Sequence, residues 1–234
     1  MKQIHELINR EDPGWPLVRQ WIAEATNPVE VLPPPDDKTR EAALVAAQVT
    51  TRSPMGAVIY ESGGILVDHG WLRVLGSGHP RLPRTLPAWN FGRSFSKPGQ
   101  QPAFLLCADD VVGGFFAIDG GGLKLETGKV CYFAPDTMVW ENTELGYSQF
   151  LAWAFQGDLA KYYETLRWPG WEKDSAALPG DQVFNFYPLL AAFMNDAEAA
   201  AVDRSRRPVS ISEIYELAVG YAGERKPVSN ISTK

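Results

Sequence analysis

Residues 113–135, GGFFAIDGGGLKLETGKVCYFAP, decide how this chain folds. Two runs within them, FFAID and VCYFA, are apolar at both alternating sets of positions, which is typical of central strands covered on both faces. Between the runs lie three consecutive glycines and a Gly-Lys pair, a composition found both in phosphate-binding loops and in turns. The class of function depends on which of the two this segment is.

The glycine-rich segment does not fit a phosphate-binding loop. That motif needs Gly, four residues and then Gly-Lys-Ser/Thr, between a strand and a helix. Counting back from Gly128 places Leu123 at the first glycine, and Val130 stands where a hydroxyl would hold magnesium. A second glycine motif, GSGHPR at 76–81, has Arg81 where a dinucleotide fingerprint needs glycine. We therefore predict a hairpin connection and no cofactor.

The rest of the pattern predicts an α+β protein in which a central, mainly antiparallel sheet is flanked by N-terminal and C-terminal helices. We expect one domain over 1–234, with a core of about 40–172 and a C-terminal helical extension of about 173–234. Asp68-His69-Gly70 is predicted as a hairpin turn. The elements expected outside the glycine-rich hairpin are helices over 4–8, 16–25, 38–50, 148–168 and 214–222, strands within 29–32, 63–75, 103–108 and 138–141, and loops over 78–102 and 168–182. A kink or a division in two is expected at Gly157.

Composition limits the partners and the compartment. The net charge is −6, which argues against nonspecific nucleic-acid binding because that usually needs a basic face. The apolar runs are too short to cross a bilayer, and the N-terminal residues lack the apolar segment of a secretory signal. Cys107 and Cys131 lie in strand-like apolar runs, so we expect buried thiols and not a disulfide framework. A cytoplasmic protein without membrane or nucleic-acid partners follows.

No motif indicates a catalytic or metal site. His69 and His79 flank one predicted strand, and with Asp68 they could form a metal site, but the usual ligand spacings are missing and turn roles explain them better. A Gly-x-Ser-x-Gly elbow is not found. Carboxylates such as Asp109 and Asp110 lie near predicted strand ends, where turn formation accounts for most of them. We predict no catalytic, metal-binding or cofactor-binding residue, and an enzyme stays open because active sites need no linear motif.

Two clusters rich in tryptophan are the candidate binding residues. The chain has eight tryptophans, and an exposed Trp tends to mark a binding surface. One cluster lies on the predicted hairpin and the other, RWPGWE, follows the predicted long helix. Their alternatives are an arginine paired within the fold and tryptophans that pack back as a lock on the helix. The candidate binding residues are Asp68, His69, Trp71, Arg73, Trp168 and Trp171.

The chain also resembles known families. It closely resembles a bacterial family known only as domain-of-unknown-function family 2625, from about 61 to 171 and more loosely along most of the chain. The similar stretches are ESGGILVDHGWLRVLGSG, GGFFAIDGGG, GKVCYFAPDTMVWENTELGYSQFLAWAFQGDL and YYETLRWPGW. That resemblance implies no assigned activity.

More distantly, the order of features resembles the SUKH superfamily. Its members share a Gly-Gly strand opening, a strand with small residues, a Gly-led strand and a helix beginning at Ser-x-Phe-Leu. Here these features correspond to 63–64, 113–119, 128–133 and 148–151. The resemblance implies a SUKH-like α+β domain, and many such proteins are bacterial immunity proteins that bind toxins, while others are regulatory binding modules.

Three hypotheses about function follow. The first is a non-enzymatic module that binds another protein, of immunity type or otherwise, and an acidic surface would suit a basic partner. The second is a small-molecule-binding protein or enzyme with a pocket near His69 and Arg73. The third is a protein that associates with itself as a homo-oligomer.

Overall fold

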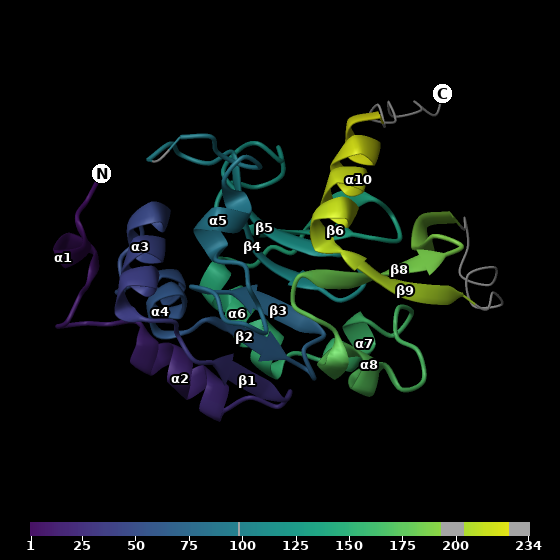
Figure 1. The fold of residues 1–234 in the computed structure, drawn as a ribbon, viewed down its shortest axis with the longest axis horizontal. Coiled ribbons are helices and arrows are strands. Elements are labelled where there is room, and N and C mark those ends of the chain that lie inside the picture. The colour runs from purple at the N-terminus through teal and green to yellow at the C-terminus, as the bar shows by residue number, and fades with distance from the viewer. Residues whose placement is uncertain (98, 193–203, 225–234) are drawn as a thin grey trace, which may run out of the picture.

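The chain folds around a seven-stranded antiparallel sheet whose strands stand in sequence order (Figure 1). The computed structural model describes residues 1–97, 99–192 and 204–224. The predicted α+β single-domain class is confirmed. The seven strands are β1 (Val29–Leu32), β2 (Gly64–Val67), β3 (Leu72–Leu75), β4 (Phe104–Asp110), β5 (Phe115–Asp119), β6 (Val130–Ala134) and β7 (Val139–Asn142).

The glycine-rich segment is the predicted connection between neighbouring antiparallel strands, β5 and β6. Its backbone amides do surround an anion, but that anion is the chain's own Asp119 carboxylate. Asp119 Oδ1 accepts from the N–H groups of Gly121 and Leu123 at 2.6 and 3.1 Å, and Oδ2 accepts from that of Leu125 at 3.1 Å. The loop is therefore folded by an internal carboxylate, which takes the hydrogen bonds that a phosphate would receive in a nucleotide site.

The first five helices come from the N-terminal part of the chain. They are α1 (Ile4–Leu7), α2 (Trp15–Ala23), α3 (Asp37–Ala47), α4 (Pro54–Glu61) and α5 (Leu86–Asn90). Asp36 caps α3 by accepting from Thr39 N–H. Two of these helices were not predicted. Pro54 opens α4 behind the Ser53 cap, and α5 lies inside the segment 78–102 expected to be irregular. Both begin with proline in the first turn, where its missing N–H costs nothing.

The C-terminal part contains α6 (Tyr147–Gln156), α7 (Leu159–Tyr162), α8 (Trp171–Ala177), β8 (Gln182–Tyr187), the short 3₁₀ helix η1 (Leu190–Ala192), β9 (Ser205–Ser210) and α10 (Ile211–Glu224). The helix predicted over 148–168 is two helices, because Gly157 is extended and Asp158 caps the second one. The loop predicted over 168–182 contains α8. The predicted helix over 214–222 is confirmed as part of α10.

The expected helical extension also holds a two-stranded sheet, in which β8 pairs with β9. Phe184 N–H donates to the Val111 carbonyl at 2.7 Å, so β8 is tied to the end of β4. The predicted division into a core of about 40–172 and an extension of about 173–234 stays a prediction.

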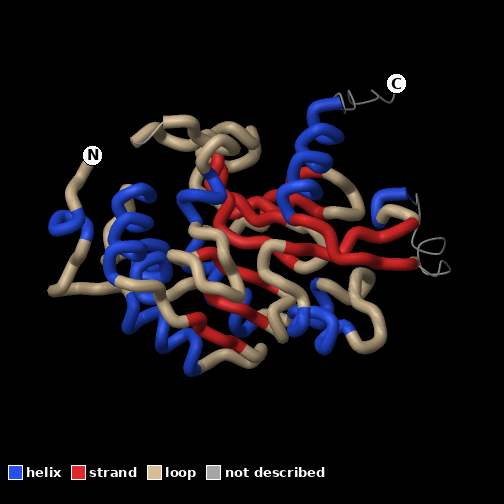
Figure 2. The backbone as a smooth tube through the Cα atoms, viewed as in Figure 1, coloured by secondary structure: helices blue, strands red, loops and turns tan. Residues whose placement is uncertain are grey.

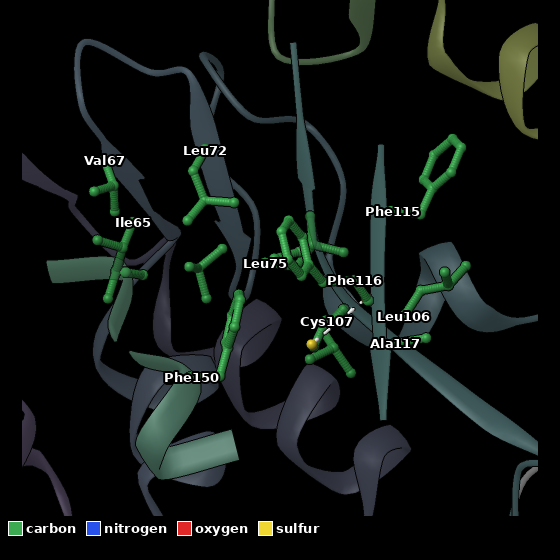
Figure 3. Close-up of a cluster of buried hydrophobic side chains, with 14 of the residues drawn as sticks. Ile65, Val67, Leu72, Leu75, Leu106, Cys107, Phe115, Phe116, Ala117 and Phe150 are labelled. Carbon is green, nitrogen blue, oxygen red and sulfur yellow. Dashed lines mark hydrogen bonds between the residues drawn. The ribbon is translucent and has the colours of Figure 1, made fainter. Parts of the chain in front are cut away.

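The sheet is covered on both faces (Figure 2). Phe115 and Phe116 are neighbours in β5 that point to opposite faces, and they are 1% and 0% exposed. Phe116 packs against Phe150 of α6 at 5.0 Å between ring centroids, and Phe115 packs against Tyr215 of α10 at 5.3 Å. Figure 3 shows Phe116 and Phe150 within the buried cluster. The predicted double coverage is confirmed, and it is the reason that these strands are apolar at both sets of positions.

Two further predictions concern membrane-spanning segments and the two cysteine thiols. In the described ranges, no helix has the length and hydropathy to span a membrane. Cys107 and Cys131 are both buried free thiols, as predicted. Burial raises the pKa of Cys131 to about 11, and it also raises that of Cys107, so neither is an activated thiolate.

Candidate functional site

The turn between β2 and β3 carries the first group of predicted binding residues. Asp68, His69 and Gly70 have left-handed φ angles of 53°, 59° and 80°, and Trp71 N–H donates to the Asp68 carbonyl at 3.0 Å. The predicted hairpin turn is confirmed. It leaves His69 exposed while Asp68 and Trp71 are buried.

Trp71 is the centre of an aromatic cluster. Its ring is fully buried, and the ring centroids of Tyr163, Trp168 and Trp171 lie 5.3, 5.6 and 5.2 Å away. His69 joins the edge of the cluster through Trp171 at 5.9 Å. The two tryptophans of RWPGWE therefore pack onto Trp71 at the β2–β3 turn, whereas their packing alternative placed them against the preceding helix. Tyr163 was missed, because its sequence position offered only a place on a helix face.

Arg167 links the cluster to the turn by charge. Its guanidinium forms an ion pair with Asp68, and both side chains are nearly buried. The same group lies over the ring of Trp171, 3.9 Å from the centroid, and over Trp71 at 5.0 Å. Cation–π contacts of this kind are strongest where solvent is excluded. Arg167 is the first residue of the RWPGWE cluster, but its pairing with Asp68 was not predicted, because 99 residues separate the two.

A second ion pair holds Trp168. The indole Nε1–H of Trp168 donates to Asp174 of α8 at 2.8 Å, and Arg206 of β9 lies 2.9 Å from the same carboxylate. Arg206 also covers the Trp168 ring at 4.5 Å from its centroid. The hydrogen bonds from Trp168 and Arg206 lower the pKa of Asp174. The cluster thus joins the β2–β3 turn, α8 and β9.

Arg73 belongs to a different and fully buried network. Arg73 Nη2 lies 2.6 Å from Asp109 Oδ1, and Arg84 Nη1 lies 2.6 Å from Asp109 Oδ2. Arg73 Nη1 donates to the Gln182 carbonyl at 2.7 Å, while Arg84 Nε and Nη2 donate to the Gly180 carbonyl at 3.1 and 2.7 Å. Two guanidinium groups therefore share one carboxylate and fasten the chain before β8 to the sheet. We call Arg73, Asp109 and Arg84 the buried triad.

Asp110, the next residue, is held on the opposite face of the sheet. Its carboxylate accepts from the Tyr132 hydroxyl at 2.7 Å and from the N–H groups of Gly114 and Val112 at 2.8 and 3.1 Å. Burial raises the pKa of Asp110 to about 6, although these hydrogen bonds act in the opposite direction. Asp110 is fully buried, so its carboxyl group holds its proton to a different pH in the folded protein than in the unfolded chain. The stability of the protein should therefore depend on pH.

The residues considered for a metal site are not gathered. Within 1–97, 99–192 and 204–224, no three His, Cys, Asp or Glu side chains are placed to hold one metal ion. His79 lies in a tight turn in which its backbone exchanges hydrogen bonds with Leu82, and His69 packs against Trp171.

An apolar groove lies between β8, the first turns of α10 and the connection from β6 to β7. It encloses about 110 Å³ and is lined by the apolar side chains of Phe133, Met138, Phe184, Phe186, Leu189, Ile214 and Leu217. Leu189 and Leu217 are 44% and 47% exposed, and Val139 of the adjacent edge strand β7 is 41% exposed. Such a concentration of half-exposed apolar side chains is typical of an interaction surface. The groove was not predicted from the sequence, since its walls come from four separate segments.

Fold and site together define a single-domain α+β protein with a seven-stranded antiparallel sheet, a buried triad and a tryptophan cluster that fastens its C-terminal segments. The chain belongs to the family described as "Protein of unknown function DUF2625", whose model matches residues 4–214.

Relatives of this chain share almost its full length. It is 46% identical over 217 residues to "Putative uncharacterized protein YbfG" of Escherichia coli (strain K12), covering 93% of this chain and 95% of that protein. It is 43% identical over 216 residues to an "Uncharacterized protein" of Haemophilus influenzae (strain ATCC 51907 / DSM 11121 / KW20 / Rd), covering 92% and 93%. Neither name describes an activity.

Proposed function

We propose that this protein is a cytoplasmic, non-enzymatic module that binds a partner protein through the apolar groove between β8, α10 and the β6–β7 connection. The observation that carries the proposal is the groove itself, with Leu189 and Leu217 half-exposed at its rim. Apolar anchors that enter such a groove supply most of the binding energy of a typical interface. The tryptophan cluster then has a supporting role, because it holds β9 and α8 against the turn between β2 and β3.

The chemistry of the partner follows from charge. The chain carries a net charge of −6, and exposed acidic residues neighbour the lining residues along the chain: Asp136 before Met138, and Glu213 and Glu216 beside Leu217. A partner with an apolar anchor flanked by basic side chains is complementary to this surface. An immunity-type interaction with a basic toxin, which the resemblance to the SUKH superfamily implies, has this chemistry.

A matched pair of substitutions tests the proposal. Leu217→Asp puts a charge into the groove, whereas Leu17→Asp changes a leucine of similar exposure, 45%, on α2. Capture from the native host should recover a basic partner with the wild-type protein and with Leu17→Asp, and lose it with Leu217→Asp. Equal recovery by both variants, or a complex unaffected by Leu189→Asp, would contradict docking at the groove.

Self-association is distinguished by light scattering of the purified protein. A mass that doubles with concentration in the wild type and not in Leu217→Asp would assign the groove to a second copy of the chain. If the protein stays monomeric at all concentrations, the occupant of the groove is a different protein.

A further inference from the structure

β7 is the last strand of the seven-stranded sheet, and its outer edge is open in the described part of the chain. The strand pairs with β6 alone, and no backbone hydrogen bond joins Val139–Asn142 to any other described segment. Its side chains are exposed except for that of Trp140, which is half-buried. The unpaired N–H and C=O groups along such an edge can receive a further strand from another chain.

Two residues, Trp140 and Asn142, place their backbone groups on this open edge. Thr143 N–H donates to the Val130 carbonyl at 3.1 Å, which fixes the hydrogen-bonded pairs between β6 and β7. Such pairs alternate along an antiparallel ladder, so the backbone groups of Glu141 are directed to β6. Its two neighbours in the strand therefore direct theirs away from the sheet.

The two faces of the edge differ in chemistry, and the first face is apolar. Trp140 is directly opposite Phe133 of β6, and their ring centroids are 5.4 Å apart. Directly opposed residues of two strands point to the same face, so Trp140 lies on the face where Phe133 lines the apolar groove. Met138, which precedes β7, lines the same groove. This face of the edge therefore continues the wall of the groove.

The other face of the edge is acidic. Glu141 is directly opposite Tyr132, whose ring centroid lies 5.8 Å from that of Tyr162 in α7. Burial first, and then carboxylates that include Glu141 and Asp136, raise the pKa of the Tyr162 hydroxyl, so both acids lie near this ring. Each accepts a hydrogen bond from Thr137, and neither forms an ion pair within the described ranges. Their negative charge is left for a partner to balance.

We infer that the partner adds a strand to β7, and that this strand alternates apolar with basic side chains. Successive residues of a strand point to opposite faces, so the apolar side chains lie on the groove face and the basic ones lie beside Glu141 and Asp136. Backbone hydrogen bonds to Trp140 and Asn142 supply part of the affinity, as is usual when a strand joins a sheet edge. The inference rests on the proposed docking at the groove, and it adds the conformation and the side-chain pattern of the docked segment.

A second copy of this chain does not suit the edge. Two β7 strands joined antiparallel about a two-fold axis would form one continuous sheet, in which equivalent faces lie on the same side. Glu141 and Asp136 of both copies would then gather on one face, where like charges destabilise the pairing. Charge therefore favours a basic strand from a different protein.

Short synthetic peptides test strand addition on the full-length protein without the native partner. A peptide that alternates Val and Lys should bind saturably, shift the amide NMR signals of Trp140 and Asn142 and slow their hydrogen exchange. A peptide of equal length that alternates Val and Glu should bind about tenfold more weakly or less, since it places like charges side by side. Equal affinity for the two peptides would contradict the inferred pattern.

Backbone methylation separates strand addition from simple charge attraction. N-methylation of one alternating set of peptide residues removes every N–H that faces β7 and should abolish binding. Methylation of the other set leaves those N–H groups free and should preserve binding, because only every second residue bonds to the neighbouring strand. The inference is overturned if both methylated peptides bind equally well, or if the protein signals that move lie away from β7.

A matched pair of variants locates the charge. Glu141→Lys should weaken binding of the Val and Lys peptide about fivefold or more, because it replaces an attraction with a repulsion. Glu24→Lys makes the same change of net charge at an exposed residue next to α2, and it should leave the affinity unchanged. An equal effect of the two variants would show attraction by net charge alone and would refute the site.

The two proposals fail separately. A native partner that is lost on Leu217→Asp but bound equally by wild type and Glu141→Lys would keep the groove and overturn strand addition. Peptide binding at β7 that Leu217→Asp leaves unchanged would keep the edge as a docking site and remove the groove.

Discussion

Replacing Asp109 with alanine should destabilise the protein by about 3 to 5 kcal/mol, because it leaves two buried guanidinium groups without a counter-charge. Asp109 is 0% exposed, and the side chains of Arg73 and Arg84 are 2% and 8% exposed. Both ion-pair distances are 2.6 Å.

The expected effect is large enough to measure by two methods. For a domain of this length, each kcal/mol lowers the melting temperature by about 2 to 4 °C, so Asp109→Ala should lower it by roughly 6 to 20 °C. Urea unfolding followed by tryptophan fluorescence should give the same free energy, because Trp71 loses its buried environment on unfolding. The slope of the free energy against urea concentration should be unchanged.

Two comparisons separate the buried triad from ordinary ion pairs. Asp12→Ala breaks a pair with Arg52 in which both side chains are about 70% exposed, and it should cost less than about 1 kcal/mol. Arg84→Met leaves Arg73 and Asp109 as a balanced pair but removes two donors from the Gly180 carbonyl, so its cost should lie between the other two. If Asp109→Ala costs no more than Asp12→Ala, the argument from buried charge is wrong.

Three other substitutions test separate features. Because burial raises the pKa of Asp110 from 3.8 to about 6, the folded state holds its proton to higher pH than the unfolded chain does, and this group removes on the order of 3 kcal/mol of stability as pH rises from about 3 to about 7. The free energy of unfolding of Asp110→Asn minus that of the wild type should therefore increase over this range, and a constant difference would contradict the assignment. Asp119→Ala should cost about 2 kcal/mol and speed hydrogen exchange at Gly121 and Leu123, whereas Asp119→Asn should lie between it and the wild type; unchanged exchange would refute the role of the carboxylate. Gly114→Ala should cost about 1 to 3 kcal/mol in urea unfolding, because its Cβ would lie 2.4 Å from both the Asp110 carboxylate and the Tyr132 hydroxyl, and wild-type stability in this variant would show that the two groups can move apart.

The buried triad also fastens the start of the C-terminal part to the sheet. Arg84 donates to the Gly180 carbonyl, and Arg73 donates to the Gln182 carbonyl at the start of β8. The tryptophan cluster acts in a similar way on the other side of α8, since Asp174 bonds Trp168 and Arg206. The segments around α8, β8 and β9 are therefore fastened by buried or partly buried ionic contacts.

Local pattern was sufficient for the strands of the main sheet and for the turns that join β2 to β3 and β5 to β6, but not for β8 and β9. FFAID and VCYFA are recognisable because both of their faces are buried, and Asp68-His69-Gly70 is a turn because its residues tolerate left-handed φ angles. Short elements were harder to predict. The helices α4, α5 and α8 have eight, five and seven residues, and helices of this length form only when tertiary contacts stabilise them.

The partners of the candidate site residues depended on the tertiary structure alone. The sequence by itself identified Asp68, Trp71 and Arg73 as a polar and aromatic run, and it excluded a phosphate-binding loop at the glycine-rich hairpin. It could not pair Asp68 with Arg167, or Arg73 with the Gln182 carbonyl, because 99 and 109 residues separate them. Periodicity reports which face of an element is apolar, whereas ion pairs, grooves and cavities arise where distant segments pack on the same sheet, and only the folded chain determines those neighbours.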